Sequence, residues 1–85
     1  MADKFDKAEL LDVISGALLT ATNKSALSEP LTPASGMRTP AEWDSLSFVH
    51  VFLAVHEAFG LEPEDDDAIQ FTSVDGISEF LNAVL

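Results

Sequence analysis

The sequence lacks cysteine altogether and is poor in basic residues. Without cysteine it can form neither a disulfide framework nor a thiolate metal site, which fits a reducing compartment. Only four lysines and arginines stand against fifteen acidic residues, so the formal charge is −11. Nucleic acids and anionic membrane surfaces are bound through Lys and Arg, and this balance argues against both as partners. Partners with basic patches are favoured instead, because opposite charge speeds diffusional encounter.

The sequence also lacks a targeting segment and a long apolar run. Its first residues have neither the basic region nor the apolar stretch of a signal peptide. The most apolar helix candidate, residues 46–59, is too short to cross a bilayer. A chain of 85 residues has room for one core and none for a deep enzyme cleft. We therefore expect a cytoplasmic monomer that forms one domain over residues 1–85 and is not an enzyme.

Apolar residues at helical spacing predict a first helix over residues 3–22. The residues on its apolar arc are Leu10, Leu11, Ile14, Ala17, Leu18 and Ala21. Residues 25–44 follow as a long connection rich in Pro, Ser and Thr, which breaks any periodicity. Long ordered loops in small domains tend to be functional. We expect this one to be partly ordered, with four apolar residues against the core: Leu27, Leu31, Met37 and Trp43.

Residues 45–59 predict a second, central helix, because apolar residues spread over more than a third of its circumference. This buried arc contains Phe48, Val49, Val51, Phe52, Val55 and Phe59, and a narrow exposed strip contains Ser47, His50, Ala54 and Glu57. Leu46 and Leu53 lie beside that strip and are expected to stay partly exposed. His56 is expected at the edge of the core. Gly60 is placed to end the helix as a C′ glycine.

An acidic turn over residues 62–67 leads into a short helix at 67–71, with Ile69 and Phe71 expected to face inward. The last helix begins with Thr72 or Ser73 as its cap, and residues 72–75 resemble a capping box. Its apolar stripe contains Ile77, Phe80, Leu81 and Val84. No alternating strand pattern occurs. The expected fold is all-α: a small bundle of three main helices and one short helix, with the first two antiparallel across the long loop.

Asp44-Ser45-Leu46 opens the second helix and is the candidate site. As a plain helix start, Asp44 or Ser45 would be a preferred capping residue. A hydrolase would need a base touching Ser45, but His50 lies on another part of the helix and His56 lies three turns away. An EF-hand loop within 62–73 is also excluded, since it would lack the glycine at its sixth position and the glutamate at its twelfth.

The order of these features resembles the acyl and peptidyl carrier protein family. The matching features are the amphipathic first helix, the long loop, Asp44-Ser45-Leu46 before an apolar second helix, the ending Glu57-Ala58-Phe59-Gly60, the acidic turn, a short third helix and a last helix opening near Thr72-Ser73-Val74. The resemblance covers essentially the whole chain. It implies that Ser45 carries 4′-phosphopantetheine, transferred from coenzyme A by a phosphopantetheinyl transferase, with Asp44 as a helper. The arm would then hold cargo as a thioester.

Two departures from the family pattern bear on partners. Trp43 stands where many members have glycine, and we expect it to anchor the loop. The exposed strip of the second helix offers only one acidic residue, Glu57, where carriers for fatty-acid synthesis usually have several. This favours a specialised carrier whose acyl-activating, condensing or acyl-transfer enzymes contact Leu46, His50, Leu53 and Glu57. An acyl chain, a polyketide unit or an amino acid remains open as cargo, and an unmodified helical interaction module is the rival interpretation.

Overall fold

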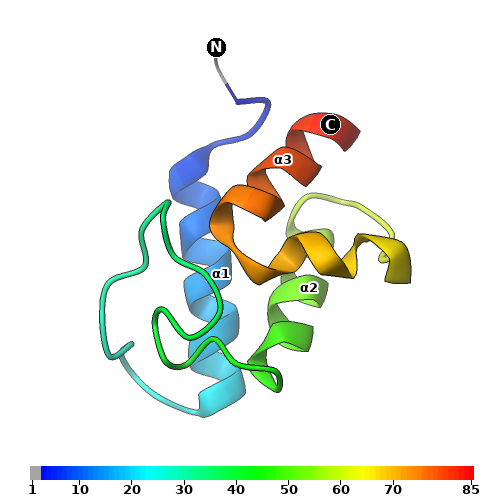
Figure 1. Cartoon of the computed structure of the whole chain (residues 1–85). Helices are drawn as coiled ribbons and strands as arrows, with labels where there is room; N and C mark the ends of the chain where they lie inside the picture. The colour runs from blue at the N-terminus through cyan, green and yellow to red at the C-terminus, as the bar shows by residue number, and fades with distance from the viewer. Residues whose placement is uncertain (1–2) are drawn as a thin grey trace.

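The computed structural model describes residues 3–85, and over this range the chain is helical without a named strand. Helix α1 (Lys7–Thr22) and helix α2 (Ser47–Ala58) run antiparallel and pack side by side, as Figure 1 shows. The 3₁₀ helix η1 (Asp65–Thr72) crosses α2 and leads into α3 (Val74–Val84). This arrangement confirms the predicted all-α bundle. Among the described residues, no helix has the length and hydropathy needed to span a membrane.

Helix α1 begins four residues later than predicted. Asp6 is its N-cap, since the side chain accepts a hydrogen bond from the N–H of Ala8 at 2.9 Å. An aspartate whose side chain accepts a hydrogen bond from a free backbone N–H marks the start of the helix that follows it. The residues before Asp6 are therefore not part of α1. At the other end Asn23 adopts the left-handed conformation, and the N–H of Lys24 bonds to the carbonyl of Leu19. The predicted end at residue 22 is therefore confirmed.

Helix α2 ends as predicted at Gly60. This glycine has a φ of +68°, which is unfavourable for residues with a side chain. The N–H of Leu61 reaches back to the carbonyl of His56 at 2.8 Å, and that of Gly60 to the carbonyl of Glu57. These two bonds form a Schellman motif, which satisfies the last carbonyls and turns the chain toward η1.

His56 was expected at the core edge, and this prediction is wrong, because the side chain is fully buried. Its ring centroid lies 4.5 Å from that of Phe52, 5.0 Å from that of Phe71 and 5.4 Å from that of Phe80. Its Nδ1 lies 2.7 Å from the carbonyl oxygen of Phe52. Since a carbonyl only accepts, Nδ1 carries the proton. The imidazole thus packs as an aromatic ring, and its Nδ1–H is hydrogen-bonded within its own helix.

The η1–α3 segment corrects three further expectations. Ile69 does not face inward, because 79% of its surface is exposed, whereas Phe71 is fully buried as predicted. Val84, expected in the apolar stripe of α3, is also exposed. Ser73 caps α3 by accepting from the N–H of Gly76 at 2.9 Å, so Asp75 takes no part in a capping box. Ile69 and Phe71 are two residues apart, so their side chains point in different directions in a 3₁₀ helix and in an α-helix alike.

The long connection between α1 and α2 is ordered by contacts at several points. Trp43 is fully buried in the core, and Leu27, Leu31 and Met37 pack against that core. The middle of the loop also pairs with the start of α3. The N–H of Met37 bonds to the carbonyl of Thr72 at 2.9 Å, and the N–H of Val74 bonds to that of Ser35 at 3.0 Å. These contacts confirm the expectation of a partly ordered loop with Trp43 as an anchor.

The acidic turn suggests a prediction about salt. Asp65, Asp66 and Asp67 form the first turn of η1, within a chain of charge −11. Repulsion among these carboxylates opposes the compact state, and added salt screens it. We expect sodium chloride, or millimolar divalent cations, to raise the melting temperature by a few degrees. Thermal unfolding followed by circular dichroism checks this, and a melting temperature insensitive to both additions would contradict it.

Candidate functional site

Asp44 forms the start of the α2 region. Its Oδ1 accepts hydrogen bonds from the N–H of Leu46 at 3.0 Å and of Ser47 at 2.9 Å. Its carbonyl accepts the N–H of Phe48 at 2.8 Å, the first bond of helical spacing. By these contacts Asp44 is the N-cap, although the regular helix is counted from Ser47. The N–H groups of Ser47 and Leu46 favour the ionised carboxylate and lower the pKa of Asp44 below its ordinary value.

Ser45 lies in this capped turn, with its side chain exposed to solvent. The residue before the cap, Trp43, is buried, and its backbone is held on both sides. Its N–H bonds to the carbonyl of Pro40 at 3.0 Å, and its carbonyl accepts the N–H of Arg38 at 2.7 Å. The chain therefore passes from a fixed, buried tryptophan to an exposed serine within two residues. A hydroxyl in this position is open to an approaching enzyme while its backbone stays in place.

The exposed face of α2 contains all four residues predicted for partner contact, which are Leu46, His50, Leu53 and Glu57. Leu46 is 81% exposed and Leu53 is 50% exposed. At 100° per residue these four positions lie within one narrow arc. The structure thus brings them together on one side, next to Ser45.

Two residues of α2 lie on the opposite side from the one predicted. Val49 is 52% exposed and joins the face of Leu46 and Leu53, whereas Ser47 is buried. Val49 is three residues after Leu46 and four before Leu53, and this spacing was the available signal. Ser47 lies four residues before Val51, which is fully buried, and so shares the side of α2 that packs inward. The exposed face is therefore more apolar than the sequence indicated.

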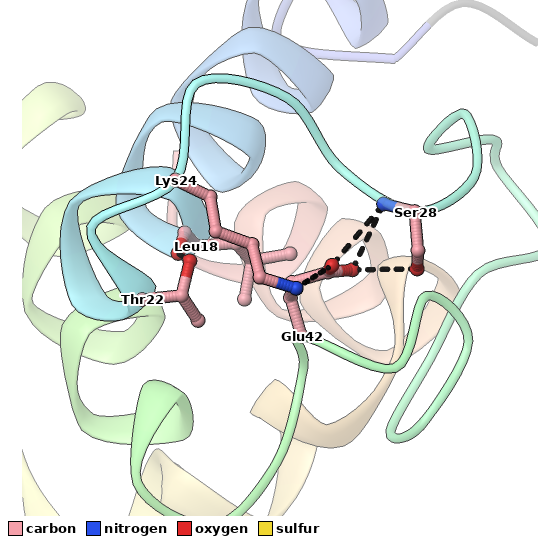
Figure 2. Close-up of polar contacts among 5 residues, drawn as sticks. All are labelled: Leu18, Thr22, Lys24, Ser28 and Glu42. Carbon is pink, nitrogen blue, oxygen red and sulfur yellow. Dashed lines mark hydrogen bonds and ion pairs between the residues drawn. The ribbon is translucent and has the colours of Figure 1, made fainter.

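Glu42 is a site-adjacent residue that sequence reasoning missed. Its side chain is almost fully buried, and Figure 2 shows it enclosed by Lys24 and Ser28. The Nζ of Lys24 lies 2.7 Å from Oε2, while the hydroxyl of Ser28 donates to Oε1 at 2.8 Å. The N–H of Ser28 also faces the carboxylate, 3.1 Å from Oε2. Hydrogen bonds from Lys24 and then from Ser28 lower the pKa of Glu42 to about 2, so it is ionised at neutral pH.

The structure supports neither of the alternative chemistries. His56 is buried about three helical turns from Ser45, roughly 16 Å along the axis at 1.5 Å per residue, and its Nδ1 bonds to Phe52. It cannot serve Ser45 as a base. Among residues 3–85, no three His, Cys, Asp or Glu side chains gather as a metal site.

Comparison with known proteins gives one informative result. No protein-family model matches the chain. Among curated proteins, the acyl carrier protein of Rubrobacter xylanophilus is 30% identical over 76 residues. This alignment covers 89% of the present chain and 91% of the relative, so it extends over most of the fold rather than a local motif.

Proposed function

The chain belongs to the acyl carrier protein family and is a carrier rather than an enzyme; from this premise we propose that Ser45 is the attachment point of 4′-phosphopantetheine. The observation that carries the proposal is an exposed serine in a turn fixed by the Asp44 cap and by buried Trp43. Residues 1–85 would act as one carrier domain, and we propose the cytoplasm as its compartment.

The residues around Ser45 fit such a group. Attachment places a phosphodiester, which is anionic, on the serine oxygen. The dipole of α2 favours a negative charge near this end of the helix, while the N–H groups of Leu46 and Ser47 stay bonded to Asp44. Exposure of Ser45 leaves the phosphate hydrated, and no buried group has to move to admit it.

The transfer step uses the Ser45 hydroxyl as the nucleophile. Its oxygen forms a bond to the phosphorus that carries the pantetheine arm in coenzyme A, and the bond to the other phosphate breaks. Adenosine 3′,5′-bisphosphate leaves, and the serine proton passes to a base of the transferase or to water. Asp44 lies next to Ser45 with an ionised carboxylate, a suitable helper beside a Mg²⁺ that the transferase supplies. Once bound, the arm supplies a terminal thiol that holds cargo as a thioester.

Partner enzymes would bind the exposed face of α2. Leu46, Val49 and Leu53 provide apolar contact, and Glu57 is its one carboxylate. The acidic turn at 62–67 adds negative charge elsewhere, which favours acyl-activating, condensing or acyl-transfer enzymes with basic patches. Exposed apolar groups flanked by few charges suit brief, repeated encounters. We infer a specialised acyl carrier of fatty-acid or polyketide type. The alternative to be distinguished from it is a carrier of aminoacyl groups.

Cargo loading tests this function. The protein is incubated with a broad-specificity phosphopantetheinyl transferase and a short-chain acyl coenzyme A. We expect the intact mass to rise by one acyl-phosphopantetheine group, and hydroxylamine to remove only the acyl part, because it cleaves thioesters. A chain that gains no mass under conditions that modify another carrier protein would instead be an unmodified interaction module.

A further inference from the structure

Glu42 is a charged residue in an unusual place, and its burial calls for an explanation. It lies three positions before Ser45, and only a few per cent of its surface is exposed. Burying a carboxylate carries a desolvation penalty, and a buried ion pair is often no more stabilising than apolar residues of similar size. The best-attested benefit of such groups is to select one arrangement of the chain. The question is which arrangement Glu42 selects.

The partners of Glu42 come from the beginning of the loop. Lys24 directly follows the end of α1, and Ser28 is four residues further on. These residues lie 18 and 14 positions before Glu42, yet their donors surround its two oxygens at 2.7–3.2 Å. Glu42 therefore ties the two ends of the α1–α2 connection together, as Figure 2 shows. We call this set, Lys24, Ser28 and Glu42, the loop clamp.

The loop clamp is connected directly to the turn that contains Asp44 and Ser45. The N–H of Asp44 bonds to the carbonyl of Glu42 at 3.1 Å, so the backbone that carries the cap starts at the clamp. Trp43, between them, is fixed in the core. The clamp and the tryptophan thus hold the chain on both sides of one peptide unit, immediately before Asp44 and Ser45.

We propose that Glu42 is a positioning residue for the transfer of the arm to Ser45, acting through the loop clamp. This inference rests on the proposed function. Because its side chain is almost fully buried, we do not expect Glu42 to contact the transferase or coenzyme A. Instead, the clamp keeps the Asp44–Ser45 turn in the conformation that the transferase binds. When the clamp is opened, the turn samples other conformations, and the apparent affinity falls by the fraction of time spent in the competent one.

The test compares two variants that open the clamp with one matched control. E42Q replaces the carboxylate by an amide, which forms no ion pair with the ammonium group and has only one oxygen to accept hydrogen bonds, and K24M removes the cation. E29Q is the control, because Glu29 lies in the same loop, is exposed, and loses the same charge. All are assayed with coenzyme A and the transferase at a temperature where circular dichroism shows each variant fully folded.

We expect E42Q and K24M to raise the KM for the carrier by about tenfold and to leave kcat within twofold, because the bound enzyme restores the turn. The double variant K24M/E42Q should resemble E42Q alone, since both changes remove the same contact. E29Q should keep the wild-type KM. A KM for E42Q equal to that of E29Q would overturn the proposal, even if E42Q melts at a lower temperature, because Glu42 would then serve stability alone.

Amide hydrogen exchange gives a readout that does not depend on the transfer reaction. The N–H groups of Leu46 and Ser47 are held by Asp44, and we expect both to exchange about tenfold faster in E42Q than in E29Q. Unchanged exchange contradicts the positioning role. If the wild-type chain gains no arm at all, it is the proposed function that fails, and the exchange rates alone then decide whether Glu42 holds the turn.

Discussion

Replacing Trp43 by alanine is expected to remove most of the stability of the fold. This side chain is the largest fully buried one among the described residues, and truncation of a large buried aromatic typically costs about 3–5 kcal/mol. The free energy of unfolding of a domain of this size is only about 5–15 kcal/mol, and each kcal/mol lost lowers the melting temperature by roughly 4–8 °C. We therefore expect Trp43→Ala to melt at least about 12 °C below wild type, or not to fold.

Two matched variants separate this effect from a general sensitivity of the region. Trp43→Phe keeps an aromatic ring in the core and removes an indole N–H that has no hydrogen-bond partner among the described residues, so it should retain much more stability. Leu46→Ala removes a mostly exposed side chain three residues away and should change the unfolding free energy by less than about 0.5 kcal/mol. Urea unfolding measures all three. A Trp43→Ala variant as stable as Leu46→Ala would show that the tryptophan is not an anchor.

Replacing Ser45 by alanine is expected to abolish modification completely without affecting the fold. Alanine has no hydroxyl to attack coenzyme A, and it is a good helix former in an exposed turn, so the unfolding free energy should change by less than about 0.5 kcal/mol. Incubation with coenzyme A and the transferase should add one arm to the wild-type chain and none to Ser45→Ala, as intact mass would record.

Ser47→Ala is the matched control for that loss. Ser47 lies two residues away in the same capped turn, but its side chain is buried. Its backbone N–H still reaches Asp44 after the substitution, because the cap uses the main chain. We expect Ser47→Ala to be modified like wild type. A Ser45→Ala chain that still gained the arm would place the attachment site elsewhere.

The parts of the fold that could be predicted from the sequence are those governed by local rules. Apolar spacing of 3–4 residues predicted the helices α1, α2 and α3, and Gly60 marked the end of α2 because few other residues accept its backbone conformation. The tryptophan anchor was also predictable, since a large aromatic residue in a polar loop is rarely left in water. The exposure of Leu46 and Leu53 followed from their place beside the polar strip of α2.

The errors occurred where one residue could satisfy two rules. His56 reads as polar, but in the fold it packs as a fourth aromatic ring and bonds within its own helix. Ile69 and Phe71 are both apolar, but they are two residues apart, so only one of them faces the core from this short helix, and it is Phe71. Either Asp3 or Asp6 could have begun α1, and the cap at Asp6 decided it.

The loop clamp could not be predicted, for a different reason. Lys24 and Glu42 are 18 residues apart in a region without periodicity, so no local pattern connects them. Their contact exists because α1, α2 and Trp43 bring the two ends of the loop together. The residues of the site could thus be proposed from the sequence, whereas the loop clamp could be recognised only in the three-dimensional structure.

The most direct test of the account is the position of the arm on the unaltered protein. The wild-type chain is modified with coenzyme A and the transferase, digested, and the peptide that contains both Ser45 and Ser47 is fragmented in a mass spectrometer. The account predicts that 4′-phosphopantetheine is found on Ser45 and on no other residue. An arm on Ser47 or elsewhere, or a chain that stays unmodified beside a modified reference carrier, would contradict it.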